Sequence, residues 1–449
     1  MYQSPSLESA IQKLSEAIQI KTISSISGKA INYQPFDDFI LFLERAYPRC
    51  HSQLEHTRVN NYGLVYRMKG KNRDAKPLLF LGHYDVAPVD MDTESKWNYS
   101  PFSGTISDGY IWGRGALDDK FQIIALFETL ELFLSKNQQP ERDVYLAFSF
   151  DEEVGGNLGA NRIASFFKVQ NLEFECILDE GSMCIDSIFP PFSRPLALVG
   201  VGEKGQVNLR ITTTQKSGHA ALPNGPNAIH LMSKTLTAIE ENPMPPRLID
   251  PIKEFLKKVS SDIHGKKRPF YDHINLMKPV LYKELSKAPM TNAMIRSTIT
   301  PTMIKGSDVS NVVPLNCSAI LNCRLLHDDT VDDIIRHISR INSKIALLDF
   351  EILMDNKPSL LSSTDSAAYR HLEACISVIF PSVEITPSIT PCATDARKYE
   401  SMSRHIYRFT PVQVSTDERG TMHNINERIS FENLSRAIGF YTTFIHNYI

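Results

Sequence analysis

The sequence predicts an α/β fold, in which a mostly parallel-sheet domain carries an inserted α+β lid domain. Through the first 200 residues, short continuous apolar runs alternate with segments of helical periodicity, which is typical of a parallel sheet that helices cover on both faces. After residue 202, apolar and polar residues alternate instead, as in strands with one solvated face. A chain of 449 residues is also long enough for two domains.

Helices and strands are expected to alternate along the first domain. Helical spacing of apolar residues predicts helices over residues 7–20, 122–134 and 161–167. Continuous apolar runs predict strands over residues 77–83, 143–150 and 175–178. Because strand–helix–strand connections are almost always right-handed, these strands should lie parallel in one sheet.

The change of pattern near residue 202 sets the expected domain boundaries. We assign residues 1–201 and 331–449 to the main domain and residues 202–330 to the inserted lid. The lid should contain strands over residues 206–213 and 316–324 and a helix over residues 227–241. A proline-rich stretch, residues 242–279, is expected to be irregular.

Composition and charge exclude several classes of function. The formal net charge is −3 without long runs of like charge, so the chain lacks the basic stripe of a nucleic-acid-binding protein. No apolar run approaches the ~18 residues that span a bilayer, and the polar N-terminus does not resemble a secretory signal. Seven cysteines without a C-x-x-C pair indicate reduced thiols. We therefore expect a cytoplasmic protein without a nucleic-acid or membrane partner.

Acidic and imidazole side chains follow each of the three expected strands. They lie in the segments His83-Tyr-Asp85, Asp151-Glu-Glu153 and Asp179-Glu180. Because sites in open parallel sheets form beyond the carboxyl ends of the strands, the three segments should converge on one place. The consecutive acids at 151–153 would repel one another unless cations neutralised them.

Two further segments add candidate metal ligands. Asp118 follows a glycine-rich turn, and His423 lies near the C-terminus. Each candidate alone has an ordinary explanation, such as a hydrogen-bonded histidine, a helix N-cap or a solvated acid. Together, histidines and carboxylates without a thiolate suit zinc, manganese or cobalt in a catalytic site for two metal ions. The candidate set is His83, Asp118, Glu153, Asp179 and His423.

Ordered motifs along nearly the whole chain also carry a family resemblance. These motifs are Gly82-His-Tyr-Asp-Val-Ala-Pro-Val89, Asp108-Gly-Tyr-Ile-Trp-Gly-Arg-Gly-Ala-Leu-Asp-Asp-Lys120, Asp151-Glu-Glu-Val-Gly-Gly156, Leu178-Asp-Glu-Gly181, Glu203-Lys-Gly205, Gly218-His219 and Asn426-Glu-Arg-Ile429. In them the chain resembles the zinc aminoacylase and carboxypeptidase metallohydrolases. It is most similar to the branch of carboxypeptidase S and the N-acyl amino acid hydrolases.

The resemblance implies a role for each candidate ligand. His83 and Asp179 would bind one divalent ion, most simply Zn²⁺, with Mn²⁺ or Co²⁺ as alternatives. Glu153 and His423 would bind a second ion, and Asp118 would bridge the two. The resemblance also implies a cis peptide bond after Asp118.

It further implies three groups that act on the substrate or on a ligand. Glu152 would be the general base, and Asp85 would orient the His83 ring. His219, in the lid, would polarise the scissile carbonyl, and in dimeric relatives this histidine comes from the partner subunit.

Three residues are weaker candidates for binding the substrate. Asn311 and Arg324 would hold its carbonyl or carboxylate, and Arg397 is an alternative for the carboxylate. A structural ion pair explains either arginine equally well.

The expected function is therefore hydrolysis of an amide bond next to a free carboxylate in small peptides or N-acyl amino acids, of the carboxypeptidase or dipeptidase type. Two alternatives remain open: an amidohydrolase acting on N-acyl amino acids with fatty-acyl or aryl groups, and a catalytically inactive binding protein on the same fold. A homodimer formed through the lid is also compatible with the resemblance.

Overall fold

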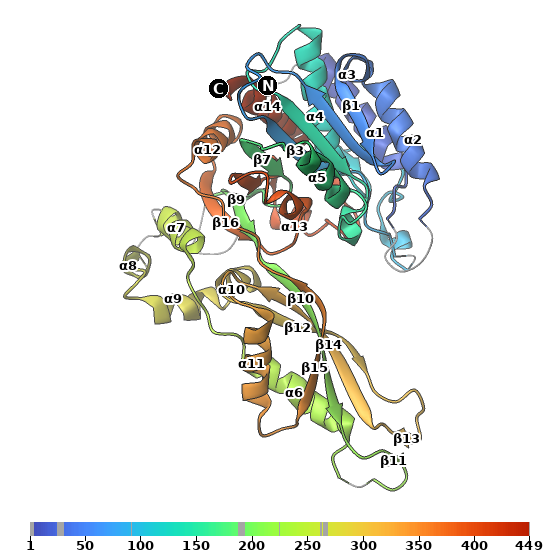
Figure 1. Cartoon of the computed structure of the whole chain (residues 1–449), viewed down its shortest axis with the longest axis vertical. Helices are drawn as coiled ribbons and strands as arrows, with labels where there is room; N and C mark the ends of the chain where they lie inside the picture. Colours follow the sequence, from blue (N-terminus) through green and yellow to red (C-terminus); the bar gives the residue numbers. More distant parts are fainter. Residues whose placement is uncertain are drawn as a thin grey trace.

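A computed structural model describes residues 4–24, 31–90, 92–186, 194–223, 225–260, 263 and 268–448 (Figure 1). Its main domain is built on a ten-stranded sheet whose central pairs are parallel. The strands follow one another in the order β1 (Glu55–Val59), β2 (Gly63–Met68), β6 (Val144–Ser149), β3 (Leu78–His83), β7 (Cys176–Asp179), β17 (Ile406–Arg408), β9 (Leu196–Glu203), β8 (Cys184–Ile185) and β18 (Gln413–Val414), and β16 (Glu384–Thr390) pairs with β9.

Helices cover both faces of this sheet, which explains why its central strands are unbroken apolar runs. Along β3, Phe80 packs in the core cluster that contains α4 (Lys120–Ser135), whereas Leu79 and Leu81 pack in a second cluster with α5 (Ala160–Val169). The first cluster also contains residues of α1 (Ser4–Gln19), α2 (Gln34–Ala46), α3 (Pro48–Gln53), α12 (Ala367–Ile379) and α14 (Phe431–Asn447). The predicted α/β class and mostly parallel sheet are confirmed.

The lid is a four-stranded antiparallel sheet. Its strands, in order, are β12 (Thr298–Lys305), β14 (Asn316–Leu325), β10 (Gly205–Thr214) and β15 (Leu348–Asn356), and it packs against α6 (Ala228–Glu241) and α11 (Val331–Asn342). Buried residues alternate with partly exposed ones along β10 and β14, as the sequence predicted. A ribbon of β11 (Gly218–His219) and β13 (Val312–Val313) forms the end of the lid farthest from the main domain (Figure 1).

The boundary expected at residue 330 is wrong. β15 pairs with β10 from Thr213↔Leu348 to Gln206↔Asn356, and α11 packs in the lid core. Residues 331–356 therefore belong to the lid rather than to the main domain. The reason is a strand pairing across more than 130 residues, which local periodicity does not reveal.

The segment expected to be irregular contains helices. It contains α7 (Asp250–Val259) and α8 (Arg268–Asp272), and α9 (Lys278–Leu285) begins at its end. Phe255 and Leu256 of α7 pack in the main-domain core, and so does Met294 of α10 (Pro289–Ile295). The chain therefore leaves the lid after α6 and returns to the main domain before β12.

A small sheet brings the C-terminal region to the glycine-rich turn. β5 (Tyr110–Trp112) pairs with β4 (Thr105–Ser107) and with β19 (Arg428–Ser430). This pairing places residues 423–427 beside residues 113–118, far apart in sequence but adjacent in the fold. In the described part of the chain, we find no helix long and apolar enough to cross a membrane.

Candidate metal centre

The expected strand ends converge at one edge of the main sheet. β3 lies between β6 and β7, and all three run parallel. His83 is the last residue of β3, the short helix Glu152–Val154 follows β6, and Glu180 follows β7.

One group of possible ligands contains His83, Asp118 and Glu180. All three are buried, and each offers an atom within 4.8 Å of the others. The Nε2 atom of His83 lies 3.0 Å from Oδ1 of Asp118 and 3.7 Å from Oε1 of Glu180.

A second group contains Asp118, Glu153 and His423. The Nε2 atom of His423 lies 2.9 Å from Oδ2 of Asp118 and 3.1 Å from Oε1 of Glu153. The two oxygens of Asp118 therefore face different histidines, which is the geometry required of a carboxylate that bridges two ions. The peptide bond after Asp118 is cis, as the resemblance implied.

Asp179, which was expected to bind a metal ion together with His83, is not in either group of possible ligands among the described residues. Its Oδ1 accepts a hydrogen bond from the backbone N–H of Glu180 (2.9 Å), and its Oδ2 accepts one from the N–H of Ala396 (2.7 Å). The neighbouring Glu180 instead faces His83. In this structure Glu180, rather than the expected Asp179, therefore stands in the first group, and both oxygens of Asp179 accept backbone hydrogen bonds.

Asp85 fixes both the His83 ring and the loop that carries the acids. The Nδ1 atom of His83 lies 3.0 Å from the carbonyl oxygen of Asp85 and 3.3 Å from its Oδ1. The same carboxylate accepts hydrogen bonds from the backbone N–H groups of Glu152 and Glu153, both 3.1 Å long. Ser24 donates a further hydrogen bond of 2.7 Å to it.

Glu427 is a supporting residue to which the sequence analysis gave no role. It is fully buried, and its Oε1 accepts hydrogen bonds from the N–H groups of Gly115, Leu117 and Asp118 at 2.9–3.2 Å. Arg114 donates to its other oxygen at 2.5 Å. In the sequence, only the family motif Asn426-Glu-Arg-Ile429 pointed to this residue, and the motif does not indicate which groups Glu427 contacts.

Negative charge dominates this edge of the sheet. Burial and neighbouring acids raise the pKa of Glu180 to about 7, and they raise the pKa values of Asp119 and Glu152 well above the ordinary range. Hydrogen bonds to Asp118 and Glu153 raise the pKa of His423 to about 11. Carboxylates in this position are stabilised by nearby cations, and histidine and carboxylate donors without thiolates fit two divalent ions.

A cavity of about 730 Å³ opens beside the two groups. Asp118, Glu152, Glu180 and His423 line one part of it, and most of the remaining wall is apolar. The apolar wall residues include Met183, Ile185, Leu198, Ile389, Met290 and Met294.

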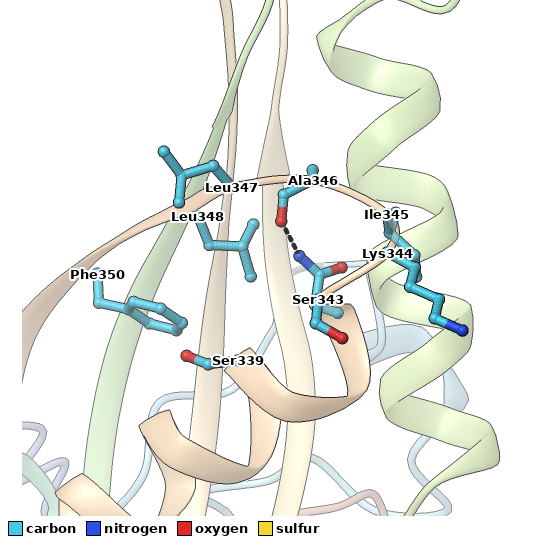
Figure 2. A pocket seen from close by; sticks show the side chains of 9 residues that line it. Ser339, Ser343, Lys344, Ile345, Ala346, Leu347, Leu348 and Phe350 are labelled. Atoms are coloured by element: carbon cyan, nitrogen blue, oxygen red, sulfur yellow. Dashed lines mark hydrogen bonds between the residues drawn. The ribbon is translucent and has the colours of Figure 1, made fainter.

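A second cavity, of about 420 Å³, lies in the lid between the end of α11 and the start of β15 (Figure 2). An Asn342–Ala346 hydrogen bond of 2.6 Å closes this turn. Lys344 is the single ionisable residue among those that line it. This second cavity therefore lacks the carboxylates and histidines that metal-dependent hydrolysis requires.

The four expected substrate-contacting residues do not line the larger cavity. Asn311 and the exposed His219 lie at the far end of the lid, where the N–H of Ala220 donates to the Asn311 carbonyl. Arg324 donates to Asn322 and Gln206. Arg397 donates to the carbonyl of Lys357 and lies 3.9 Å from Glu203.

An α/β domain with an inserted lid and paired histidine–carboxylate groups at its strand ends is the architecture of a metal-dependent hydrolase. The chain belongs to peptidase family M20/M25/M40, whose family model matches residues 79–447. It is therefore a metal-dependent peptidase or amidohydrolase.

Relatives and solved structures agree with this assignment. The chain is 34% identical to a probable carboxypeptidase S-like 2 of Dictyostelium discoideum, over 97% of this chain and 84% of the relative. It is 30% identical to the mouse N-fatty-acyl-amino acid synthase/hydrolase PM20D1, over 97% of this chain and 87% of the relative. Its fold is similar to that of the M20 metallo-carboxypeptidase Sso-CP2 of Sulfolobus solfataricus, with a TM-score of 0.68, 19% identity, and coverage of 97% and 98% of the two chains.

The presence of Glu180, in place of Asp179, in the first group of possible ligands leads to a first prediction. We expect Glu180→Gln to lower the affinity for one of two metal ions by more than about 100-fold, because a coordinating carboxylate is lost. Asp179→Asn should retain both ions, since that side chain contacts backbone N–H groups. Metal content after dialysis against limiting zinc measures both variants, and circular dichroism checks that each is folded. Loss of one ion from Asp179→Asn alone would restore the original assignment.

Proposed function

We propose that this enzyme hydrolyses the amide bond of N-acyl amino acids that carry a free carboxylate and an apolar acyl group. The observation that carries the proposal is the apolar cavity beside the two ligand groups. The similarity to relatives named N-fatty-acyl-amino acid synthase/hydrolase supports it. Hydrolysis of small peptides is the second candidate, supported by the similarity to carboxypeptidase S-like relatives.

We propose that His83, Asp118 and Glu180 hold one divalent ion and that Asp118, Glu153 and His423 hold the other. When bound, such ions supply Lewis acidity, which activates water and polarises an amide carbonyl. Zinc fits the donor set, as do manganese and cobalt.

Glu152 is the proposed proton carrier. It lines the cavity, and its carboxylate makes no hydrogen bond to another described residue, so it is free to face a water and a substrate. Burial raises its pKa, which suits a group that must accept a proton and then release it. Glu152 would take a proton from the attacking water and return it to the leaving amine nitrogen, so that the carboxylate is regenerated.

A second prediction follows from this role. We expect Glu152→Gln to lower kcat by about 10²–10⁴-fold, because the amide cannot accept the proton. Zinc content should stay at the wild-type level, since Glu152 belongs to neither ligand group. Chelation should abolish wild-type activity, and zinc, manganese or cobalt should restore it. Near-normal turnover by Glu152→Gln would exclude the assigned role.

A third prediction concerns the acyl group. If acyl chains enter the apolar cavity, each added methylene contributes about 0.8 kcal/mol, so kcat/KM should rise roughly fourfold per CH₂ until the cavity is filled. A series of N-acyl-leucines of increasing chain length, compared with Leu-Leu and Gly-Leu, measures this trend. A flat series with dipeptides hydrolysed faster would favour the peptidase candidate.

We further propose a homodimer formed through the lid. The edge strands β12 and β15 each pair on one side only among the described residues, and both expose apolar side chains such as Met303, Ile304 and Ile352. His219 lies at the distant end of the same lid (Figure 1), so it would act in the site of the partner subunit.

Mixed dimers provide the fourth prediction. Glu152→Gln and His219→Ala should each have low activity alone. After the two variants are unfolded together and refolded, part of the wild-type activity should return, because one site then combines an intact Glu152 with the partner's intact His219. The same procedure with Glu152→Gln and Glu153→Gln is the matched control and should restore nothing, because each site of the mixed dimer then carries one of the two changes. A monomer by light scattering would contradict the proposal.

We also propose a reducing compartment such as the cytoplasm. All seven cysteines are unpaired, and six of them are buried.

A further inference from the structure

Lys204 lies where the chain passes from the main sheet to the lid. It connects the last residue of β9, Glu203, to the first residue of β10, Gly205. Its backbone N–H donates to the carbonyl of Thr390 at the end of β16 (3.0 Å). The hydroxyl of Thr390 lies 3.3 Å from Ser182, two residues after the proposed ligand Glu180. Lys204 therefore stands close to the proposed metal centre.

The ammonium group of Lys204 is buried without a paired acid. The residue is 1% exposed, and its Nζ donates to the carbonyls of Ala293 (3.0 Å) and Arg296 (2.8 Å). In the described part of the chain no carboxylate comes within ion-pair distance of it. Asp329, the acid that acts on it from further away, is paired with Arg247 at 2.6 Å.

Lys120 shows what is unusual about this arrangement. Lys120 is also buried and also donates to two carbonyls, those of Ala17 and Ile20. The charged groups that act on Lys120 are acids, whereas the charged group that acts most strongly on Lys204 is the cation Arg324. Lys204 also lines the large cavity, and Lys120 does not.

These differences favour an anion beside Lys204. A buried ammonium next to a second cation is destabilised, and burial together with Arg324 lowers the pKa of Lys204 to about 7. Two of its three N–H groups are held by carbonyls, so the third can donate into the cavity. An anion there would offset the repulsion and gain a charge-assisted hydrogen bond in a cavity whose wall is mostly apolar.

A second cation on the cavity wall is Arg419, at the end of α13 (Thr416–Arg419). It is partly exposed, and its Nη1 lies 4.0 Å from the sulfur of Met290. A guanidinium that remains partly hydrated gains less from an added anion than a buried ammonium does.

We propose that Lys204 binds the substrate carboxylate and so determines the preference for substrates with a free acid. The inference rests on the proposed hydrolysis of N-acyl amino acids, and it gives that reaction an anchor that none of Arg324, Arg397 and Asn311 supplies in this structure. Arg324 pairs with Gln206, two residues after Lys204, and does not line the cavity. Its charge would strengthen the positive potential at Lys204 without contact with the substrate.

The test compares two substrates that differ in charge alone, N-dodecanoyl-leucine and N-dodecanoyl-leucinamide. The measured quantity is the ratio of kcat/KM for the acid to that for the amide. We expect Lys204→Met to reduce this ratio by about 30-fold or more, since a buried charge pair is lost. Lys204→Arg, which keeps the charge, should retain most of the preference.

Two further variants keep the result interpretable. Lys120→Met removes the same kind of buried lysine outside the cavity, so general destabilisation would change its activity on both substrates and leave the ratio unchanged. Arg419→Gln tests the rival anchor. Wild-type enzyme that hydrolyses neither substrate would refute the proposed function itself. A wild-type preference for the acid that survives in Lys204→Met, or that disappears in Arg419→Gln alone, would refute the role of Lys204.

Discussion

The site depends on holding several carboxylates together at one buried edge of a sheet. Burial and mutual repulsion raise the pKa values of Asp119, Glu152 and Glu180, so an empty cluster is electrostatically unfavourable. His83 and His423 offset part of this charge, and two further acids hold the backbone around the cluster. Asp85, two residues after the end of β3, accepts hydrogen bonds from the N–H groups of Glu152 and Glu153, and Glu427, in the C-terminal region, accepts them from Gly115 and Asp118. Such an arrangement favours cation binding because the geometry is already set before any ion arrives.

This dependence couples distant parts of the chain. Glu427 accepts three backbone hydrogen bonds from the turn that carries Asp118, and the N–H of Gly113 donates to its carbonyl at 2.8 Å. The same segment carries His423, whose Nε2 lies 2.9 Å from Oδ2 of Asp118. The two proposed ion sites share Asp118, so disturbing the C-terminal segment would disturb both ions rather than one.

The sequence predicted the elements of the main domain and the meeting of its strand ends, because apolar runs and strand polarity are local properties. It could not decide between Asp179 and Glu180. Adjacent residues at a strand end point in different directions, and the choice depends on the N–H of Ala396, which is more than 200 positions away. The helices of the region between α6 and β12 were missed for another reason. Pro251 and Pro279 lie in the stretch that was expected to be irregular, yet each stands in the first turn of a helix, where proline is favoured, and so does Pro289.

The region between α6 and β12 shapes the cavity. α10 supplies Met290 and Met294 to its wall, and the carbonyls of Ala293 and Arg296, at the end of the same helix, hold Lys204. The far end of the lid contributes nothing to this wall in one copy of the chain. Under the proposals above, the part of the insertion that returns to the main domain would determine which acyl and acid groups fit, and the part that extends away would contact a second subunit. His219 would still link the two parts, because under the proposed dimer it lies at the far end of the lid and would act in the partner's site.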